Sequence, residues 1–152
     1  MYFKSYKFRM YTDDNQKELI NKSLGCSRFV YNYFLSKIKE TKYTTSTENI
    51  NDYTHYLKYE YPFLQEVDSA IIRKSLFNLE DSFKRFFNKQ SDYPKFKSKF
   101  NRNSYNISAV YGSYENNNYC NIELDLKNKI IRLPKLNNIK VRGYRKTKTH
   151  RI

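Results

Sequence analysis

The residues best placed for chemistry in this sequence are cations, and the chemistry open to them is phosphate binding. Lys95, Lys97 and Lys99 alternate with other residues in the stretch YPKFKSKFNRNSY. In an extended chain they would share one face at intervals of about 6.6 to 7 Å, close to the phosphate spacing of a nucleic-acid strand. A basic linker with unspecific charge is the alternative. Arg102 and Tyr105 extend the stretch and pair a cation with a base-stacking ring, which favours nucleic-acid binding.

A second basic stretch covers residues 127–151, which hold ten cations and no anion. Self-repulsion on this scale indicates a polyanionic ligand. Residues 146–152 lack apolar anchors and are expected to fray without a partner. We therefore predict nucleic-acid contacts for Lys135, Lys140, Arg142 and Arg145.

Groups for catalysis or metal binding are sparse. Glu123 and Asp125 share one face of an alternating stretch, but an exposed antiparallel strand shows the same pattern. The two histidines and two cysteines have no partners at zinc-ligand spacing. We expect no metal site, no cofactor and no catalytic residue in this chain.

The overall composition agrees with a nucleic-acid partner. In 152 residues, 29 Lys and Arg against 15 Asp and Glu give a net charge of +14. Such a charge confers sequence-independent affinity for phosphate backbones, although a ribosomal or membrane-surface protein would share it. There is no apolar run of about 18 residues, which predicts no membrane span, and the N-terminus does not resemble a signal peptide. We expect a cytoplasmic, nucleoid-associated protein.

The N-terminal residues 2–10 alternate with a period of two, which predicts a strand. Phe8 and Met10 lie on its apolar side, and Lys7 and Arg9 lie on the other side as candidate contacts.

Helical spacing of apolar residues follows this strand. Asp13 and Asp14 offer an N-cap, and the pattern continues to Ile38 as two helices, bent or broken near Gly25. A short helix through residues 53–59 ends before Pro62.

The clearest helix begins at the cap Asp68, and its apolar stripe is Ile72, Leu76, Leu79, Phe83 and Phe86. The cations at other angles form either a solvated face or further contacts; they are Arg73, Lys74, Lys84 and Arg85.

After Pro94 the period changes from helical to two, which predicts strands. Residues 120–126 and 130–133 form a hairpin, and a last strand covers Ile139 and Val141. The apolar face of the N-terminal strand is expected to pair with this C-terminal sheet. The predicted fold is α+β, a small OB-like β-barrel with an inserted helical bundle.

Five separated blocks carry a family resemblance: YKFRMYTDDNQKELINKSLGCSRFVYNYFL, LKYEYPFLQEVDS, NLEDSFKRFF, YPKFKSK and IIRLPKLNNIKVRGYR. In order and spacing they resemble the N-terminal half of the TnpB (OrfB) proteins of insertion sequences, from Tyr6 to Tyr144. The resemblance implies a wedge β-barrel over residues 1–11 and 95–145, a helical recognition domain over 12–94, and a basic tail at 146–152. It also implies binding of a guide RNA, target DNA and their heteroduplex in a transposition-associated protein. The family's RuvC-like nuclease domain would begin after about residue 150, and its zinc-binding CxxC pairs are not found in this sequence.

The resemblance places Arg28 and Asn32 near the family's nucleic-acid groove. The family often has glutamines after the VDS motif, whereas this sequence has Ala70, Arg73 and Lys74, so amide readout of a target-adjacent motif is not expected.

These observations favour a truncated TnpB-like protein that binds structured guide RNA, DNA or both without cutting. One alternative is the N-terminal fragment of an active RNA-guided endonuclease whose RuvC-like domain is supplied elsewhere, by a separate catalytic partner. Another is a small helix-turn-helix repressor, which would require a homodimer and a palindromic site.

Overall fold

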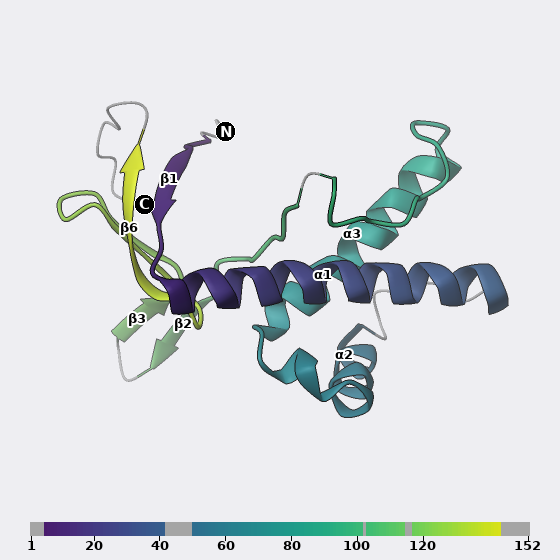
Figure 1. The fold of residues 1–152 in the computed structure, drawn as a ribbon, viewed down its shortest axis with the longest axis horizontal. Helices are drawn as coiled ribbons and strands as arrows, with labels where there is room; N and C mark the ends of the chain where they lie inside the picture. Colours follow the sequence, from purple (N-terminus) through teal and green to yellow (C-terminus); the bar gives the residue numbers. More distant parts are fainter. Residues whose placement is uncertain (1–4, 42–49, 102, 115–116, 144–152) are drawn as a thin grey trace. The chain divides into compact units, whose positions relative to one another are not determined.

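The computed structural model describes residues 5–41, 50–101, 103–114 and 117–143 (Figure 1). The helical elements are α1 (Asp14–Thr41), α2 (Ile50–Glu60), the 3-10 helix η2 (Pro62–Gln65) and α3 (Ser69–Phe87). The strands are β1 (Phe8–Tyr11), β2 (Tyr111–Tyr114), β3 (Asn117–Cys120), β4 (Glu123–Asp125), β5 (Ile130–Leu133) and β6 (Asn137–Gly143). The α+β class predicted from the sequence is confirmed.

The chain separates into two compact units. A sheet unit comprises Met1–Lys17 and Ala109–Ile152, and a helical unit comprises Glu18–Ser108. Residues 95–108 lie in the helical unit, whereas the domain boundaries expected from the sequence assigned them to the barrel.

In the sheet unit, four antiparallel strands follow the order β1-β6-β5-β4. The first and last strands of the chain are neighbours, so the predicted pairing of the N-terminal strand with the C-terminal sheet is confirmed (Figure 1). The β4–β5 hairpin and the strand through Ile139 and Val141 are confirmed as well. Within the described residues the ladders form an open sheet, and no pairing closes it into the expected barrel.

A separate β2–β3 hairpin precedes this sheet, and the sequence reasoning did not predict it. Gly112 lies directly opposite Tyr119. A Cβ on Gly112 would overlap the outer atoms of the Tyr119 ring, so a larger residue there would displace that exposed ring.

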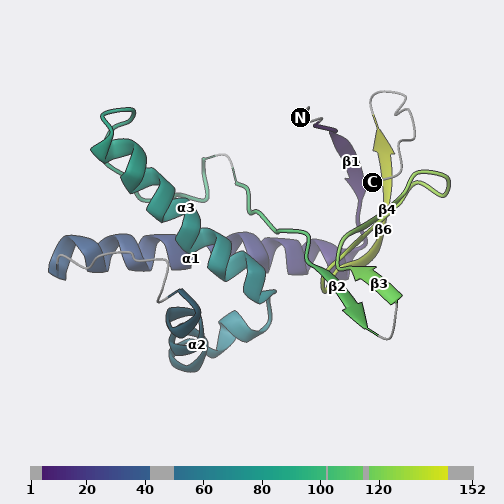
Figure 2. The same cartoon turned by 180° about the vertical axis from the view of Figure 1, so that it is seen from behind.

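The helix α1 is continuous through Gly25, so the predicted break is wrong (Figure 2). A Cβ at Gly25 would meet nothing within 4 Å, whereas its neighbour Cys26 is buried. Glycine in a helix interior costs only about 1 kcal/mol relative to alanine. The uninterrupted stripe of buried residues on the inner side of α1 outweighs that cost.

Both long helices begin at aspartate caps. The Asp13 carboxylate accepts from the Gln16 N–H at 2.7 Å, and the Asp13 N–H donates to Gln16 Oε1 at 3.2 Å, which is a reciprocal capping box. Asp68 accepts from the Ala70 N–H at 2.7 Å, as the sequence predicts for the start of α3.

The core of the helical unit lies between α1, α2, η2 and α3. A buried hydrogen bond of 2.8 Å joins Ser27 of α1 to Ser75 of α3. The buried residues of this core are Cys26, Val30, Tyr31, Phe34, Leu35, Leu57, Leu64, Val67, Ile72, Leu76, Leu79 and Phe83.

Candidate nucleic-acid interface

One face of the four-stranded sheet gathers basic and aromatic side chains, and we call it the basic sheet face. Arg9 of β1 pairs with Arg142 of β6, and Tyr11 pairs with Lys140. Cross-strand partners share a face, as do residues two apart, so these four side chains lie together. All four residues are exposed. The guanidinium carbon of Arg9 lies 5.9 Å from the centre of the Tyr11 ring.

The opposite face of the same sheet is apolar, which is why the register matters. Met10 pairs with Val141 and Ile131 pairs with Ile139. Ile139 and Val141 are buried. A slip of one residue would move these side chains into solvent, so the burial of one face fixes the cations on the other.

Arg9 and Arg142 are placed against each other without an anion between them. Like charges directly opposite one another in a sheet are destabilising. Among the described residues neither arginine, nor Lys140, forms an ion pair. The like charges of the basic sheet face therefore repel one another, and a bound polyanion would reduce this repulsion.

The acidic groups on this face are already engaged. Glu123 lies 3.5 Å from Arg132 across the β4–β5 pair. Asp125 accepts from the Lys127 N–H at 2.9 Å and from the Asn128 N–H at 2.9 Å. The hydrogen bonds from Asn128 hold the pKa of Asp125 below its usual value. Both carboxylates therefore make their contacts within the β4–β5 hairpin.

Two further predicted contacts lie near this sheet. Lys7 is exposed and directly precedes β1. Lys135 is exposed in the β5–β6 turn with a φ of 62°. Arg145 and Arg102 lie outside the described residues.

In the helical unit, Asn32 and Lys97 are brought together, but through the backbone of Lys97. Asn32 Nδ2 donates to the Lys97 carbonyl at 2.9 Å, and the Lys97 N–H donates to Asn32 Oδ1 at 2.8 Å. This pair of bonds, which we call the Asn32 clasp, occupies both ends of the amide. It fixes the segment after α3 onto α1.

Arg28 makes a second attachment next to the clasp. Its guanidinium donates to Asn103 Oδ1 at 2.7 Å, and Asn103 Nδ2 donates to the Lys99 carbonyl at 2.8 Å. Arg28 and Asn32 therefore lie one turn apart on α1, and both hold the same segment.

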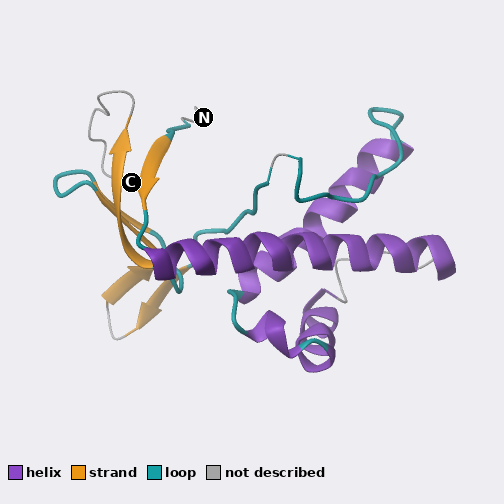
Figure 3. Ribbon diagram, viewed as in Figure 1, coloured by secondary structure: helices purple, strands orange, loops and turns teal. Residues whose placement is uncertain are grey.

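The three alternating lysines differ in their exposure and in their neighbours. Residues 88–101 and 103–110 contain no strand, so the alternation of Lys95, Lys97 and Lys99 does not form one, and the strands predicted after Pro94 begin only at β2 (Figure 3). Lys95 and Lys99 are exposed, and Lys95 lies 3.7 Å from Asp92. The Lys97 ammonium lies 4.1 Å from the centre of the Tyr31 ring. Burial lowers the pKa of Lys97 below its usual value.

The predicted cations of α3 lie outside its buried stripe. Arg73, Lys84 and Arg85 are exposed, and Lys74 is half-buried with its ammonium 5.9 Å from the centre of the Phe77 ring. Lys84 pairs with Glu80 at 2.9 Å, and hydrogen bonding to Glu80 raises the pKa of Lys84.

Tyr105 is half-buried. Burial, and then the charge of Asp68, raises the pKa of the Tyr105 hydroxyl.

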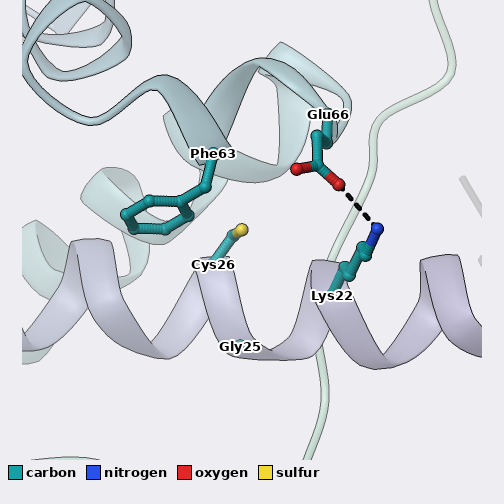
Figure 4. A pocket seen from close by; sticks show the side chains of 5 residues that line it. All are labelled: Lys22, Gly25, Cys26, Phe63 and Glu66. Atoms are coloured by element: carbon teal, nitrogen blue, oxygen red, sulfur yellow. Dashed lines mark ion pairs between the residues drawn. The ribbon is translucent and has the colours of Figure 1, made fainter.

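A hollow of ≈ 240 Å³ lies between α1 and η2, lined by Lys22, Gly25, Cys26, Phe63 and Glu66 (Figure 4). The Lys22 ammonium lies 2.7 Å from Glu66 and 3.0 Å from Glu18. Burial, and then the charge of Glu66, raises the pKa of the Cys26 thiol, which disfavours the nucleophilic thiolate. Among the residues that the structure describes, no group of three His, Cys, Asp or Glu could hold a metal ion.

The sequence reasoning did not select Tyr11. Tyr11 lies two residues after Arg9, so the same alternation places both side chains on one face. The strand was expected to end at residue 10, which left Tyr11 out. The local sequence does not indicate that Arg9 lies opposite Arg142, because their pairing depends on the register of two strands about 130 residues apart in the chain.

The fold and this surface define a class: an α+β protein whose basic sheet face is suited to a polyanion. Comparison with known proteins sharpens this class. Residues 1–46 match the family model HTH_OrfB_IS605, a helix-turn-helix domain. In the described part of that range the structure holds β1 and the single continuous helix α1.

A curated relative from Streptomyces pristinaespiralis is named "Putative RNA-guided DNA endonuclease". It is 30% identical over 104 residues, which cover 63% of this chain and 25% of the relative. The chain thus spans a quarter of the length of the curated relative it matches. Together the two matches confirm the resemblance to the N-terminal part of TnpB (OrfB)-type insertion-sequence proteins, and they support nucleic-acid binding. No helix in the described residues is long and apolar enough to span a membrane.

Proposed function

We propose that this chain binds structured guide RNA, DNA or both, and that the basic sheet face is its principal contact surface. The observation that carries the proposal is the opposition of Arg9 and Arg142 across β1 and β6. Two unpaired guanidiniums at directly opposed positions of a sheet repel each other and do not stabilise the fold. A phosphate between them would accept a charge-assisted hydrogen bond from each. Tyr11 adds a ring beside them that can stack on a base or sugar.

The choice of RNA rests on the relative rather than on the sheet. The relative is named for an RNA-guided activity on DNA, and its aligned region covers 63% of this chain. We propose that this chain performs the nucleic-acid-holding part of such a system. The cutting step would belong to a RuvC-like domain outside the sequence described here, either within a longer protein or on a separate catalytic partner.

The helical unit would contribute a second set of phosphate contacts. Lys95, Lys99 and Arg85 are exposed. Arg28, Asn32 and Lys97 would support these contacts indirectly, because their hydrogen bonds hold the segment in place.

The test is the salt dependence of binding, measured by fluorescence anisotropy on a structured RNA hairpin. The wild type should show a log–log slope of several units, as expected when about 4 to 8 phosphates are neutralised. The double variant Arg9→Gln/Arg142→Gln should bind more weakly on every sequence and reduce the slope by about 2. Far-UV circular dichroism should stay unchanged, since both side chains are exposed.

The matched control is Lys17→Gln/Lys140→Gln. It removes the same charge, but only Lys140 lies on the basic sheet face, so the slope should fall by about 1. A flat salt response of the wild type, or equal slopes for all three proteins, would contradict the proposal.

A second candidate is recognition of duplex DNA as a small repressor, which the helix-turn-helix family match favours. It requires a homodimer and a palindromic site. Sequencing the RNA that copurifies with the chain separates the candidates, because guide binding predicts one transposon-end transcript and the repressor predicts none. Light scattering that shows a dimer on a palindromic duplex would favour the repressor.

A further inference from the structure

The last residue of α3 and the segment that follows it expose phenylalanine rings, which is unusual for the most apolar of the aromatic residues. Phe87 is 74% exposed and Phe100 is 87% exposed. Exposed aromatic rings next to cations are the elements from which single-strand binding surfaces are built. We refer to residues 87–100 as the aromatic–basic segment.

The Phe87 end of this segment packs against other aromatic rings. The Phe87 ring centre lies 6.2 Å from that of Phe83 and 5.4 Å from that of Phe86. Tyr93 folds back against the same cluster, 5.6 Å from Phe83 and 5.3 Å from Phe86. The exposed ring of Phe87 therefore lies against a cluster of packed aromatic rings.

The turn after α3 is also fixed. The Gln90 N–H donates to the Arg85 carbonyl at 2.8 Å, and the Lys89 N–H donates to the Phe86 carbonyl at 2.9 Å. These bonds form a Schellman C-cap, in which the left-handed position is normally glycine. Here it is Lys89, with a φ of 58°. A cation thus occupies a backbone position where glycine would be less strained.

The Phe100 end is held by the Asn32 clasp and by a local turn. The Phe100 N–H donates to Ser98 Oγ at 3.2 Å, and Asn103 bonds the carbonyl of Lys99 at 2.8 Å. The Lys99 ammonium lies 5.2 Å from the centre of the Phe100 ring. This end of the segment presents an exposed ring and a cation side by side.

The charge of the region selects the ligand. Residues 84–102 carry seven cations and one anion. The single anion, Asp92, lies 3.7 Å from Lys95. An apolar protein surface would match the rings but not the charge, whereas an unpaired nucleic-acid strand offers base faces and phosphates together.

We propose that the aromatic–basic segment binds an unpaired single strand, with bases stacked on Phe87 and Phe100 and phosphates beside Lys89 and Lys99. This inference rests on the proposed nucleic-acid function and adds a site to it. Duplex regions would bind elsewhere on the chain, because their bases are already stacked on one another.

The test compares the full chain with the variant Phe87→Ala/Phe100→Ala on a single-stranded oligouridylate and on a blunt RNA hairpin of equal charge. The variant should lose at least about tenfold in affinity for the single strand, since each stacked base contributes substantially. Its salt slope should not change, because no phosphate contact is removed. Its affinity for the hairpin should stay within about twofold of the wild type.

Two further variants keep the result interpretable. Phe87→Tyr/Phe100→Tyr retains the rings and should retain single-strand affinity, which excludes a general effect of altering the segment. Lys89→Gln/Lys99→Gln should lower the salt slope by about 1.4 while leaving the stacking rings in place.

The proposal is overturned if the alanine variant binds the single strand as the wild type does, or if it loses affinity equally for the hairpin. Unchanged single-strand affinity is also what a protein-docking role for the rings would give. Failure of the broader function looks different, because the wild type itself would then bind both ligands weakly and without salt dependence.

Discussion

The basic sheet face and the aromatic–basic segment contain similar cations, yet the structure uses them differently. On the sheet, Arg9 lies opposite Arg142, and Lys140 lies on the same face opposite Tyr11. None of these three cations forms an ion pair within the described residues. At the segment, Asn32 and Lys97 are bound to each other and hold the chain in place. We propose that the arginines of the sheet bind a ligand, whereas Arg28 is engaged in holding the chain beside the segment. Only the tertiary contacts distinguish these two roles of arginine.

The largest expected effect comes from breaking the attachment. Asn32→Ala removes the acceptor of the Lys97 N–H and the donor to its carbonyl, both partly buried. Leaving such groups unsatisfied should lower the free energy of unfolding by about 2 kcal/mol. Urea denaturation followed by circular dichroism measures the change.

The matched control is Asn101→Ala, at the exposed asparagine that directly follows the aromatic–basic segment. It should change stability by no more than about 0.5 kcal/mol. If Asn32→Ala were equally neutral, Asn32 would be available for nucleic acid and the contrast between the two regions would disappear.

A smaller effect of opposite sign is expected on the sheet. Arg9→Gln/Arg142→Gln removes a like-charge pair between directly opposed residues, so the variant should gain about 0.2 to 1 kcal/mol. Raising the salt concentration should reduce this gain by screening the charges of the wild type. Denaturation at low and high salt provides both measurements.

Arg132→Gln is the control within the same sheet. Its guanidinium faces Glu123 at 3.5 Å, so its removal should give no gain. A loss of stability in the Arg9/Arg142 variant would mean that these arginines are structural.

The sequence predicted those elements whose signals are local. The Asp68 cap and the apolar stripe of α3 are both present, because capping and helical spacing act within a few residues. The pairing of the first and last strands was also predictable, since an unpaired N-terminal strand needs a partner.

The errors arose where distant residues decide the conformation. The stretch around Lys97 alternates like a strand, but Asn32, 65 residues earlier, satisfies its backbone groups and holds it as an irregular segment. Gly25 suggested a break, but the continuous buried stripe keeps α1 intact. The individual contact residues remain predictions, apart from the bonds that the structure shows for Arg28, Asn32 and Lys97.

The smallest expected effect is the pH dependence of the unfolding free energy that arises from the titration of Lys97. Burial lowers its pKa in the folded protein below the ordinary value, so the unfolded chain binds more protons between the two values. The unfolding free energy should therefore rise with pH from the lowered pKa up to about 10.5.

Lys97→Met keeps an unbranched side chain near Tyr31 and removes the titration. The stability of the wild type relative to this variant should accordingly increase as the pH rises toward about 10.5. Lys99→Met, at an exposed lysine of the same segment, is the control for the loss of one cation. If both variants tracked the wild type equally across this range, the Lys97 ammonium would be solvated like that of Lys99, and it would join the phosphate-binding cations rather than the attachment of the segment.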